Sequence, residues 1–280
     1  MIDVSVIFPT YNRPAYLKLA LDSILAQQGV DLECLVLDHG STSETAAVLQ
    51  NYSDPRLRTW RREVNRAPGA TCPWQDLALN SSGRYIVLFS DDDIMMPGNL
   101  AKKSEVLNTH PECGFAFSRV ELFGDVNGLC DFDLPKQVGY LDATPFDNLI
   151  IRNQICMPSV MFRREWMPFF GVPPHGALND WALWLEIASR SRSAFIPHPL
   201  IKYRIHGNSD SKTVGGYDCE FFIQQLRIWR YWLNKGYRPT AQTYDRMERV
   251  LRDIAGQQIA LLKEAWPPLV KPMNLLNLLK

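Results

Sequence analysis

The sequence predicts an α/β fold: a mostly parallel β-sheet flanked by helices, with a helical appendage at its C-terminal end. Two observations lead to this expectation. Through the first hundred residues, apolar β-branched runs alternate with helical patterns, and such alternation favours parallel strands joined by helical crossovers. After about residue 213 the strand patterns stop and two long helical patterns follow. The 280 residues, of which 46% are hydrophobic, suffice for one large α/β domain with such an addition.

The first elements follow from periodicity and from helix start signals. A β-branched run predicts a strand over residues 2–8, and Pro14 suits the first turn of the helix that comes next. The apolar run 32–37 predicts a second strand. Ser41 or Ser43 then caps the second helix, because a serine oxygen can accept a hydrogen bond from a free N–H group of the first turn.

The later elements are less regular. The remaining strand patterns are residues 57–61, 85–89, 115–123, 159–162 and 194–204, the last of which prolines divide into one or two short strands. The remaining helical patterns end near residue 82, begin near Pro97, or cover residues 179–189, 217–234 and 240–264. Because the alternation loosens after residue 110, we expect three parts: residues 1–110, 111–212 and 213–280.

Charge and composition restrict the class of partner. Thirty Lys and Arg balance thirty Asp and Glu, so the formal net charge is zero and the pI is about 7.0. No long-range field attracts a nucleic acid, and we expect none as a partner. The six cysteines form no CxxC pair, which argues against a zinc knuckle. The chain shows no secretory signal and no run near the roughly 20 apolar residues that cross a bilayer, so we expect a cytoplasmic protein with reduced thiols.

Polar clusters follow three of the predicted parallel strands. These clusters are Thr10–Arg13, Asp38–Ser41 and Ser90–Asp93. Ligands of open α/β sheets bind beyond the carboxyl ends of the strands, so we expect the clusters to meet at one edge. The third contains three consecutive carboxylates, which repel one another unless a cation is present. Mg²⁺ or Mn²⁺ binds carboxylates together with substrate phosphates. The alternative is an acidic turn before the helix near Pro97, stabilised by the helix dipole.

Several segments resemble family 2 glycosyltransferases in residue, order and separation. They are Val4–Arg13 (VSVIFPTYNR), Leu37–Ser41 (LDHGS), Ser90–Asp93 (SDDD) with Pro97, Asn179–Trp181 (NDW) and Tyr203–His206 (YRIH). The resemblance covers roughly residues 2–210 and leaves the helical tail outside. It implies a GT-A (Rossmann-like) fold, an inverting mechanism, a nucleoside-diphosphate sugar donor and a divalent cation, Mn²⁺ or Mg²⁺. Residues 1–110 would then be the nucleotide-sugar-binding half, 111–212 the acceptor-binding half, and 213–280 a C-terminal helical extension.

The resemblance also implies roles for individual residues. The residues expected at the nucleotide are Pro9, Thr10, Tyr11, Asn12, Arg13, Asp38, His39 and Asp91. Asp92, with Asp93 and His206, would hold the metal ion. Asp180 would be the catalytic base. The chain departs from the family at His39, Ser90 and Trp74–Gln75, where relatives usually have an acid, an acid and an Arg-Asn pair. All three positions bear on nucleotide binding, which weakens the expectation that the nucleotide is UDP.

The chemistry supports a carboxylate base independently. An acceptor hydroxyl must lose its proton as it displaces the diphosphate, and a positioned carboxylate contributes roughly 10²- to 10⁴-fold to such a step. Asp180 could instead be a first-turn acid of a helix that Asn179 caps. Beside it, Trp181 is the candidate for stacking on an acceptor sugar, although core packing explains this residue equally well.

Other functions stay open from the sequence. Neither G-x-G-x-x-G nor G-x-x-x-x-G-K-[ST] occurs, which excludes a Rossmann dehydrogenase and a P-loop NTPase of the usual kind. A non-catalytic protein of the same fold that binds nucleotide-sugar or glycan is the main alternative to a transferase. The acceptor expected for a transferase is a glycan or glycolipid, as in polysaccharide biosynthesis. The helices after residue 217 could mediate self-association or recruit a partner. The leucine-rich end, Leu275–Leu279, could pack on this protein, on a partner or on a membrane surface.

Overall fold

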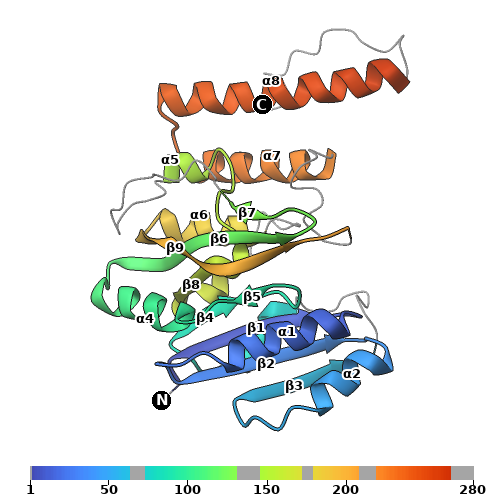
Figure 1. Cartoon of the computed structure of the whole chain (residues 1–280). Helices are drawn as coiled ribbons and strands as arrows, with labels where there is room; N and C mark the ends of the chain where they lie inside the picture. Colours follow the sequence, from blue (N-terminus) through green and yellow to red (C-terminus); the bar gives the residue numbers. More distant parts are fainter. Residues whose placement is uncertain (1, 64–72, 131–145, 172–178, 208–218, 266–280) are drawn as a thin grey trace.

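A mixed sheet organises the molecule, with helices on both faces (Figure 1). The structure, a computed structural model, describes residues 2–63, 73–130, 146–171, 179–207 and 219–265, with side chains placed for 224–253 in the two last helices. The strand order in the described part is β3-β2-β1-β4-β8-β6-β9-β5, and a short β7 pairs with β6. The leucine-rich end of the chain lies outside the described residues.

The N-terminal half contains the predicted alternation. Its elements are β1 (Val4–Thr10), α1 (Pro14–Leu25), β2 (Leu32–His39), α2 (Ser43–Gln50), β3 (Leu57–Arg62), α3 (Pro73–Leu79) and β4 (Tyr85–Leu88). All pairs among these four strands are parallel, and Thr10 of β1 lies in register with Asp38 of β2. The predicted caps of α2 are wrong: Thr42 is the N-cap, and the Ser41 hydroxyl accepts a hydrogen bond from the β1–α1 loop instead.

The second half adds antiparallel pairs to the mostly parallel sheet. Its elements are β5 (Ile94–Met95), α4 (Asn99–Thr109), β6 (Cys113–Gly124), β7 (Gly128–Leu129), α5 (Phe146–Leu149), the 3₁₀ turns η1 (Met157–Ser159) and η2 (Arg164–Phe169), β8 (Val160–Arg163), α6 (Asn179–Ala188), β9 (Arg192–Ile205), α7 (Cys219–Asn234) and α8 (Ala241–Ala265). β8 runs antiparallel to both of its neighbours, whereas β6 and β9 are parallel.

β9 is one long strand and not the one or two short strands expected. Its pairing with β6 shifts register after Ser118, so that Arg119 lies opposite Pro199 and the two residues before it bulge out. A bulge removes the need for a ladder hydrogen bond at proline, which has no N–H to donate. Because of this bulge, β9 accommodates its prolines and continues to Ile205, the residue before His206.

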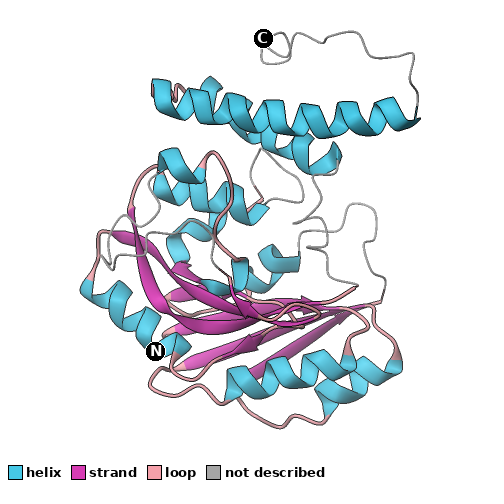
Figure 2. Ribbon diagram, turned by 45° about the horizontal axis from the view of Figure 1, so that its top comes forward, coloured by secondary structure: helices cyan, strands magenta, loops and turns pink. Residues whose placement is uncertain are grey.

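Strand alternation divides the core into two layers. Val4, Val6 and Phe8 of β1 pack with α1, α2 and α4 on one face, while Ile7 points to the other. That second face is covered by α3, α5 and α6, and the buried side chains of α7 and α8 belong to the same cluster. The C-terminal helices lie beyond α6 as further layers (Figures 1 and 2). They are therefore packed on the main body by a shared core.

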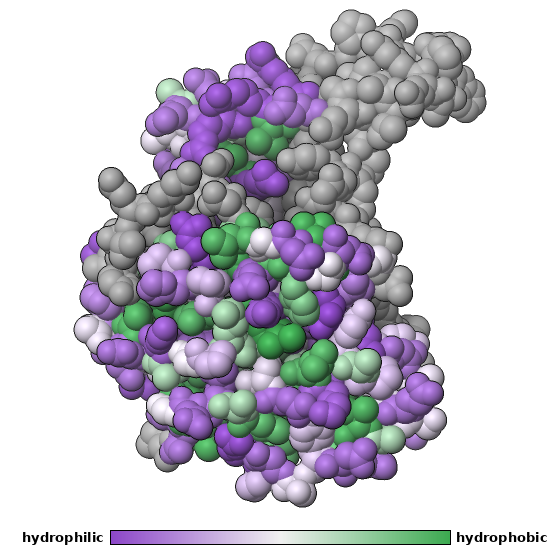
Figure 3. Space-filling view, viewed as in Figure 1, coloured by the Kyte–Doolittle hydropathy of each residue, from purple (hydrophilic) through white to green (hydrophobic). Residues whose placement is uncertain are grey.

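Specific polar contacts also hold the C-terminal helices. The Trp229 indole N–H donates to the carbonyl of Ile150 at 2.6 Å, and Gln225 Nε2 donates to the carbonyl of Ile151 at 2.8 Å. Both α7 side chains are buried and reach the segment that follows α5. In the view of Figure 3, the described surface of these helices is mostly hydrophilic. No helix in the described part of the chain combines the length and apolar character needed to cross a membrane.

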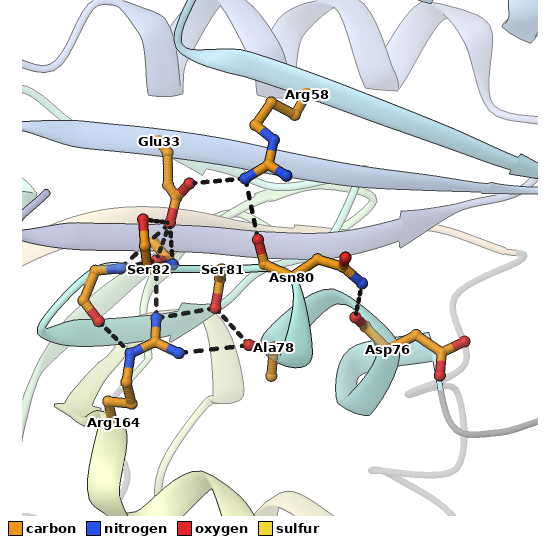
Figure 4. A network of polar contacts seen from close by, with 10 residues as sticks. Glu33, Arg58, Asp76, Ala78, Asn80, Ser81, Ser82 and Arg164 are labelled. Atoms are coloured by element: carbon orange, nitrogen blue, oxygen red, sulfur yellow. Dashed lines mark hydrogen bonds and ion pairs between the residues drawn. The ribbon is translucent and has the colours of Figure 1, made fainter.

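A polar network fixes the amino edge of the sheet, opposite the predicted site (Figure 4). Glu33 at the start of β2 accepts hydrogen bonds from the Ser5 hydroxyl at 2.7 Å and from the backbone N–H groups of Ser82 and Gly83. Burial alone would raise the pKa of Glu33, but these hydrogen bonds lower it below its usual value. A Cβ on Gly83 would lie 2.5 Å from the Ser5 nitrogen, so only glycine fits there.

Candidate active site

The β1–α1 loop and the β2–α2 loop are tied together by Asn12. Its backbone N–H donates to the Ser41 hydroxyl at 3.0 Å, and its side-chain oxygen accepts from the Thr42 N–H at 2.7 Å. Asn12 has a φ of 52°, a left-handed conformation that asparagine tolerates better than most residues. The first two polar clusters predicted from the sequence therefore meet at the carboxyl edge of the sheet, with Pro9 and Thr10 at the end of β1.

Asp91 joins the third cluster to the first. Its Oδ2 accepts hydrogen bonds from the Thr10 hydroxyl at 2.7 Å and from the Tyr11 N–H at 3.4 Å, while Arg13 donates to Oδ1 at 3.0 Å. Burial raises the pKa of Asp91, although the contacts with Thr10 and Arg13 oppose that effect. Tyr11 itself is 44% exposed, so its ring is open to a ligand at this edge.

Asp92 lies between Arg13 and His206. Its Oδ2 is 2.9 Å from Arg13 Nη1 and 3.0 Å from His206 Nε2, and the His206 ring packs on Tyr16 of α1 with centroids 5.2 Å apart. The sequence-predicted metal ligands Asp92 and His206 are thus brought together from β4 and the end of β9. Arg13 supplies a positive charge to the same carboxylate, as a bound cation would.

Asp93 is buried behind this pair. Its Oδ1 accepts from the Arg204 backbone N–H at 2.9 Å, and its Oδ2 has no hydrogen-bond partner among the described residues. Burial and the neighbouring Asp92 raise the pKa of Asp93 well above its usual value. The Arg204 guanidinium donates to the Asp92 carbonyl and lies over the rings of Tyr16 and Phe123, at 4.3 and 4.2 Å. Arg204 therefore holds the backbone of the acidic turn.

The donor set suits a metal ion that is shared with a ligand. Within the described chain, no three His, Cys, Asp or Glu side chains are arranged to hold a metal ion by themselves. One carboxylate and one imidazole, Asp92 and His206, converge at 3.0 Å, and Asp93 adds a buried oxygen without a partner. Mg²⁺ and Mn²⁺ sites with one or two protein ligands are usually completed by water and substrate phosphates. The residues present fit such a shared ion.

Asp38 and His39 end β2 with different partners. Asp38 is buried; its Oδ1 accepts from the Ser41 N–H at 2.9 Å, and its Oδ2 pairs with Arg61 Nη1 at 2.6 Å. His39 Nε2 lies 3.3 Å from Arg62 Nη1, and Arg62 in turn pairs with Asp76 of α3. Two arginines of β3 therefore face the predicted nucleotide residues, a feature that the family resemblance did not supply.

Asp180 stands in the first turn of α6. Burial raises its pKa from 3.8 to about 6, although hydrogen bonds from the Trp181 N–H and from Asn153 Nδ2 oppose the shift. The Asn153 contact is 3.3 Å long. The pKa of the Cys156 thiol is raised first by its hydrogen bond with Cys130 and by burial, and then by the charges of Asp93 and Asp180. The acidic turn and Asp180 therefore act on one thiol that lies near both.

Trp181 does not face the acid cluster. Its indole is fully buried in the core, and its N–H donates to the Leu149 carbonyl at 2.8 Å. Neither face is open to a sugar, so core packing, the alternative considered for Trp181, accounts for this residue. At Trp74–Gln75, where the chain also departs from the family, Gln75 has a structural contact: its Nε2 donates to the Phe170 carbonyl at 2.7 Å.

Several residues of the site were not singled out from the sequence. These include Tyr16, Arg61, Arg204 and Asn153, and Arg62 beside His39 is a further one. Arg204 lies two residues before His206 in the Tyr203–His206 segment, and the β3 arginines follow from the parallel pairing of β2 with β3. Tyr16 and Asn153 carry no local signal, because their contacts depend on how α1 and the segment after α5 pack.

The comparison with sequence families supports the predicted resemblance. Residues 5–129 match the family described as glycosyl transferase family 2. TuaG of Bacillus subtilis, provisionally named a teichuronic acid biosynthesis glycosyltransferase, is 29% identical over 215 residues, which are 75% of this chain and 82% of TuaG. An uncharacterized protein of Mycobacterium tuberculosis is 28% identical over 210 residues, 73% of this chain. The aligned part spans 59% of the length of that relative.

Solved structures share the fold. TarS of S. aureus, solved with UDP-GlcNAc, superposes with a TM-score of 0.70 at 16% identity and covers 89% of this chain and 72% of the TarS chain. The mannosyltransferase PcManGT of Pyrobaculum calidifontis, solved with GDP-Man and Mn²⁺, superposes with a TM-score of 0.60 at 16% identity and covers 97% of this chain and 84% of the other. These similarities confirm the predicted GT-A fold.

Proposed function

We propose that this chain, whose residues 5–129 match the family described as glycosyl transferase family 2, moves a sugar from a nucleoside-diphosphate sugar to a hydroxyl acceptor with inversion. The observation that carries the proposal is the pairing of two features. One is the tied carboxyl edge of β1, β2 and β4, with Asp91 and Asp92 at its centre. The other is a carboxylate, Asp180, whose pKa of about 6 suits a general base near neutral pH.

The nucleotide would occupy the carboxyl edge of the sheet. Tyr11 offers an open ring, while the Arg13 guanidinium offers donors to a diphosphate. Asp38 and His39 would face the nucleobase of the donor, with the β3 arginines beside them. TarS was solved with UDP-GlcNAc and PcManGT with GDP-Man, so related folds accept both uridine and guanosine nucleotides.

Asp180 would take the proton of the acceptor hydroxyl as its oxygen attacks the anomeric carbon and the diphosphate leaves from the opposite face. One base and a single displacement give inversion of configuration. Burial raises the pKa of Asp180 to about 6, so that its carboxylate holds a proton more strongly than an exposed aspartate does. A stronger base is better suited to take the proton of an alcohol. The acceptor proposed is a glycan or glycolipid.

A divalent ion at Asp92 and His206 is part of the proposal. When bound, Mn²⁺ or Mg²⁺ would neutralise negative charge on the diphosphate as it leaves. The chain's own contribution would be to present Asp92 Oδ2 and His206 Nε2 at 3.0 Å from each other, with Arg204 holding the turn. Arg13 would supply additional positive charge at the same carboxylate.

Calorimetric titration tests the donor site. UDP, GDP, dTDP and CDP are each titrated with and without Mn²⁺, first into the wild type and then into Asp92→Ala. We expect one nucleotide to bind tightly, to need the metal, and to lose that dependence in the variant. Glu105→Ala, an exposed acid on α4, is the matched control and should bind as the wild type does. No binding of any of the four nucleotides would contradict the proposal.

A non-catalytic binding protein of this fold is the second candidate. The observation in its favour is that Arg13 already pairs with both Asp91 and Asp92, so that part of the negative charge of the acidic turn is compensated from within the protein. Donor turnover separates the two candidates. Binding of a nucleotide-sugar without consumption of it, across a panel of glycan and glycolipid acceptors, would favour the binding protein.

A further inference from the structure

The surroundings of Asp180 include one side chain from outside its own helix that binds its carboxylate. Asn153 Nδ2 donates to Asp180 Oδ2 at 3.3 Å, and the backbone N–H groups of Asp180 and Trp181 also donate to the carboxylate. An ionised carboxylate has about four lone-pair directions. Three are engaged by these described groups, so roughly one stays available for an acceptor hydroxyl.

The orientation of the Asn153 amide is itself fixed. Its Oδ1 accepts a hydrogen bond from the Ile155 N–H at 3.1 Å. Because a backbone N–H can only donate, the oxygen of the amide must face Ile155 and the NH₂ group must face Asp180. The side chain therefore presents a donor to the base and not an acceptor.

The segment that carries Asn153 is anchored by the C-terminal helices. Trp229 and Gln225 of α7 donate to the carbonyls of Ile150 and Ile151, which lie three and two residues before Asn153. Both contacts are buried. The position of Asn153 is thus set by α7, which belongs to the part of the chain outside the family match.

Several charged groups on neighbouring elements are engaged elsewhere. Arg164 of η2 donates to Ser81 and to the Gly83 carbonyl, Asp147 of α5 accepts from Tyr237, and Glu186 of α6 pairs with Lys235. Arg119 of β6 and Arg192 of β9 have contacts of their own. Cys156 is the titratable neighbour on which the Asp180 charge acts, and its thiol is neutral at physiological pH. Burial and hydrogen bonds therefore govern the titration of Asp180.

We propose that Asn153 is a positioning residue for the catalytic base: its amide, held by Ile155 and by the α7 contacts, fixes the Asp180 carboxylate so that one lone pair faces the acceptor. This inference rests on the proposed function, in which Asp180 removes the acceptor proton. The Asn153 amide acts as a hydrogen-bond donor that favours the ionised form of Asp180. It also gives the C-terminal helices a part in the active site.

The test is a direct titration of Asp180 by carboxyl ¹³C NMR on protein labelled at aspartate, with Asp180→Asn identifying the resonance. Asn153→Leu removes the donor at nearly constant size, and Asn153→Asp keeps an oxygen for the Ile155 N–H while replacing the donor. We expect both to raise the midpoint, Asn153→Leu by about 0.5 to 1 pH unit. Asn148→Leu is the matched control, because Asn148 lies in α5, just before the segment that carries Asn153, and pairs with Arg246.

The kinetic counterpart is the acid limb of kcat/KM, which should move with the NMR midpoint, while kcat falls roughly 10- to 100-fold in Asn153→Leu. A merely structural role would lower activity without moving either pH curve. An unmoved midpoint in both Asn153 variants would overturn the positioning role. A moved midpoint in a protein that transfers no sugar would instead overturn the proposed function.

Discussion

Replacement of Trp229 by phenylalanine tests how firmly the C-terminal helices belong to the core. The indole is fully buried and donates to the Ile150 carbonyl at 2.6 Å. Phenylalanine keeps most of the apolar contact but leaves that carbonyl without its donor, which costs about 1–3 kcal/mol. At roughly 2–4 °C per kcal/mol for a protein of this size class, the melting temperature should fall by about 4–8 °C for a loss of about 2 kcal/mol.

Trp184→Phe is the control with the same chemical change. The Trp184 indole is also fully buried, but its N–H has no hydrogen-bond partner among the described residues. The difference between the two variants in urea unfolding therefore isolates the hydrogen bond to Ile150. Equal losses within about 0.5 kcal/mol would refute the reasoning. A separate early transition in Trp229→Phe would show that α7 unfolds apart from the main core.

Three further predictions concern pH, the nucleotide and the sheet. Transfer should rise as pH increases through about 6, because burial raises the pKa of Asp180 to that value and only the ionised base accepts a proton; a flat kcat/KM from pH 5 to 8 would count against this. His39→Ala should change the ratio of binding constants among UDP, GDP, dTDP and CDP more than the rate of transfer, whereas an equal loss of turnover with unchanged binding would contradict it. Glu33→Gln should cost about 1–2 kcal/mol at pH 7 in urea unfolding. Since the folded pKa of Glu33 lies below its usual value, its contribution is present above about pH 4.5 and is lost as pH falls through the folded pKa; a pH-independent difference would be inconsistent.

Local pattern was sufficient for the N-terminal half of the fold. The apolar run predicted over 85–89 is β4, Tyr85–Leu88, and the runs near 4 and 32 are β1 and β2. Periodicity and crossover rules determine such strands with little help from the rest of the chain. β8 could not be placed in this way, because it follows β4 and β6 in sequence yet lies between them and runs antiparallel to both.

The residues of the site also fall into those that the local sequence pattern predicts and those that depend on packing. Thr10, Asp38 and Asp91 were expected to meet because parallel strands end at one edge, and the hydrogen bonds of Thr10 and Asn12 connect the three clusters. Asn153 could not be predicted, since it approaches Asp180 only after the residues at and after the end of α5 pack against α6 and α7. Trp181 is buried in the core and not at a sugar site, and its helical spacing was compatible with either position.

The central claim is that Asp180 removes the proton of an acceptor hydroxyl in the proposed sugar transfer. The most direct measurement is donor consumption and product formation by wild type and by Asp180→Asn, with donor binding measured on the same samples. We predict that the variant binds the nucleotide-sugar as the wild type does and loses roughly 10²- to 10⁴-fold in transfer. Wild-type turnover in Asp180→Asn would contradict the account, because the base would then lie elsewhere.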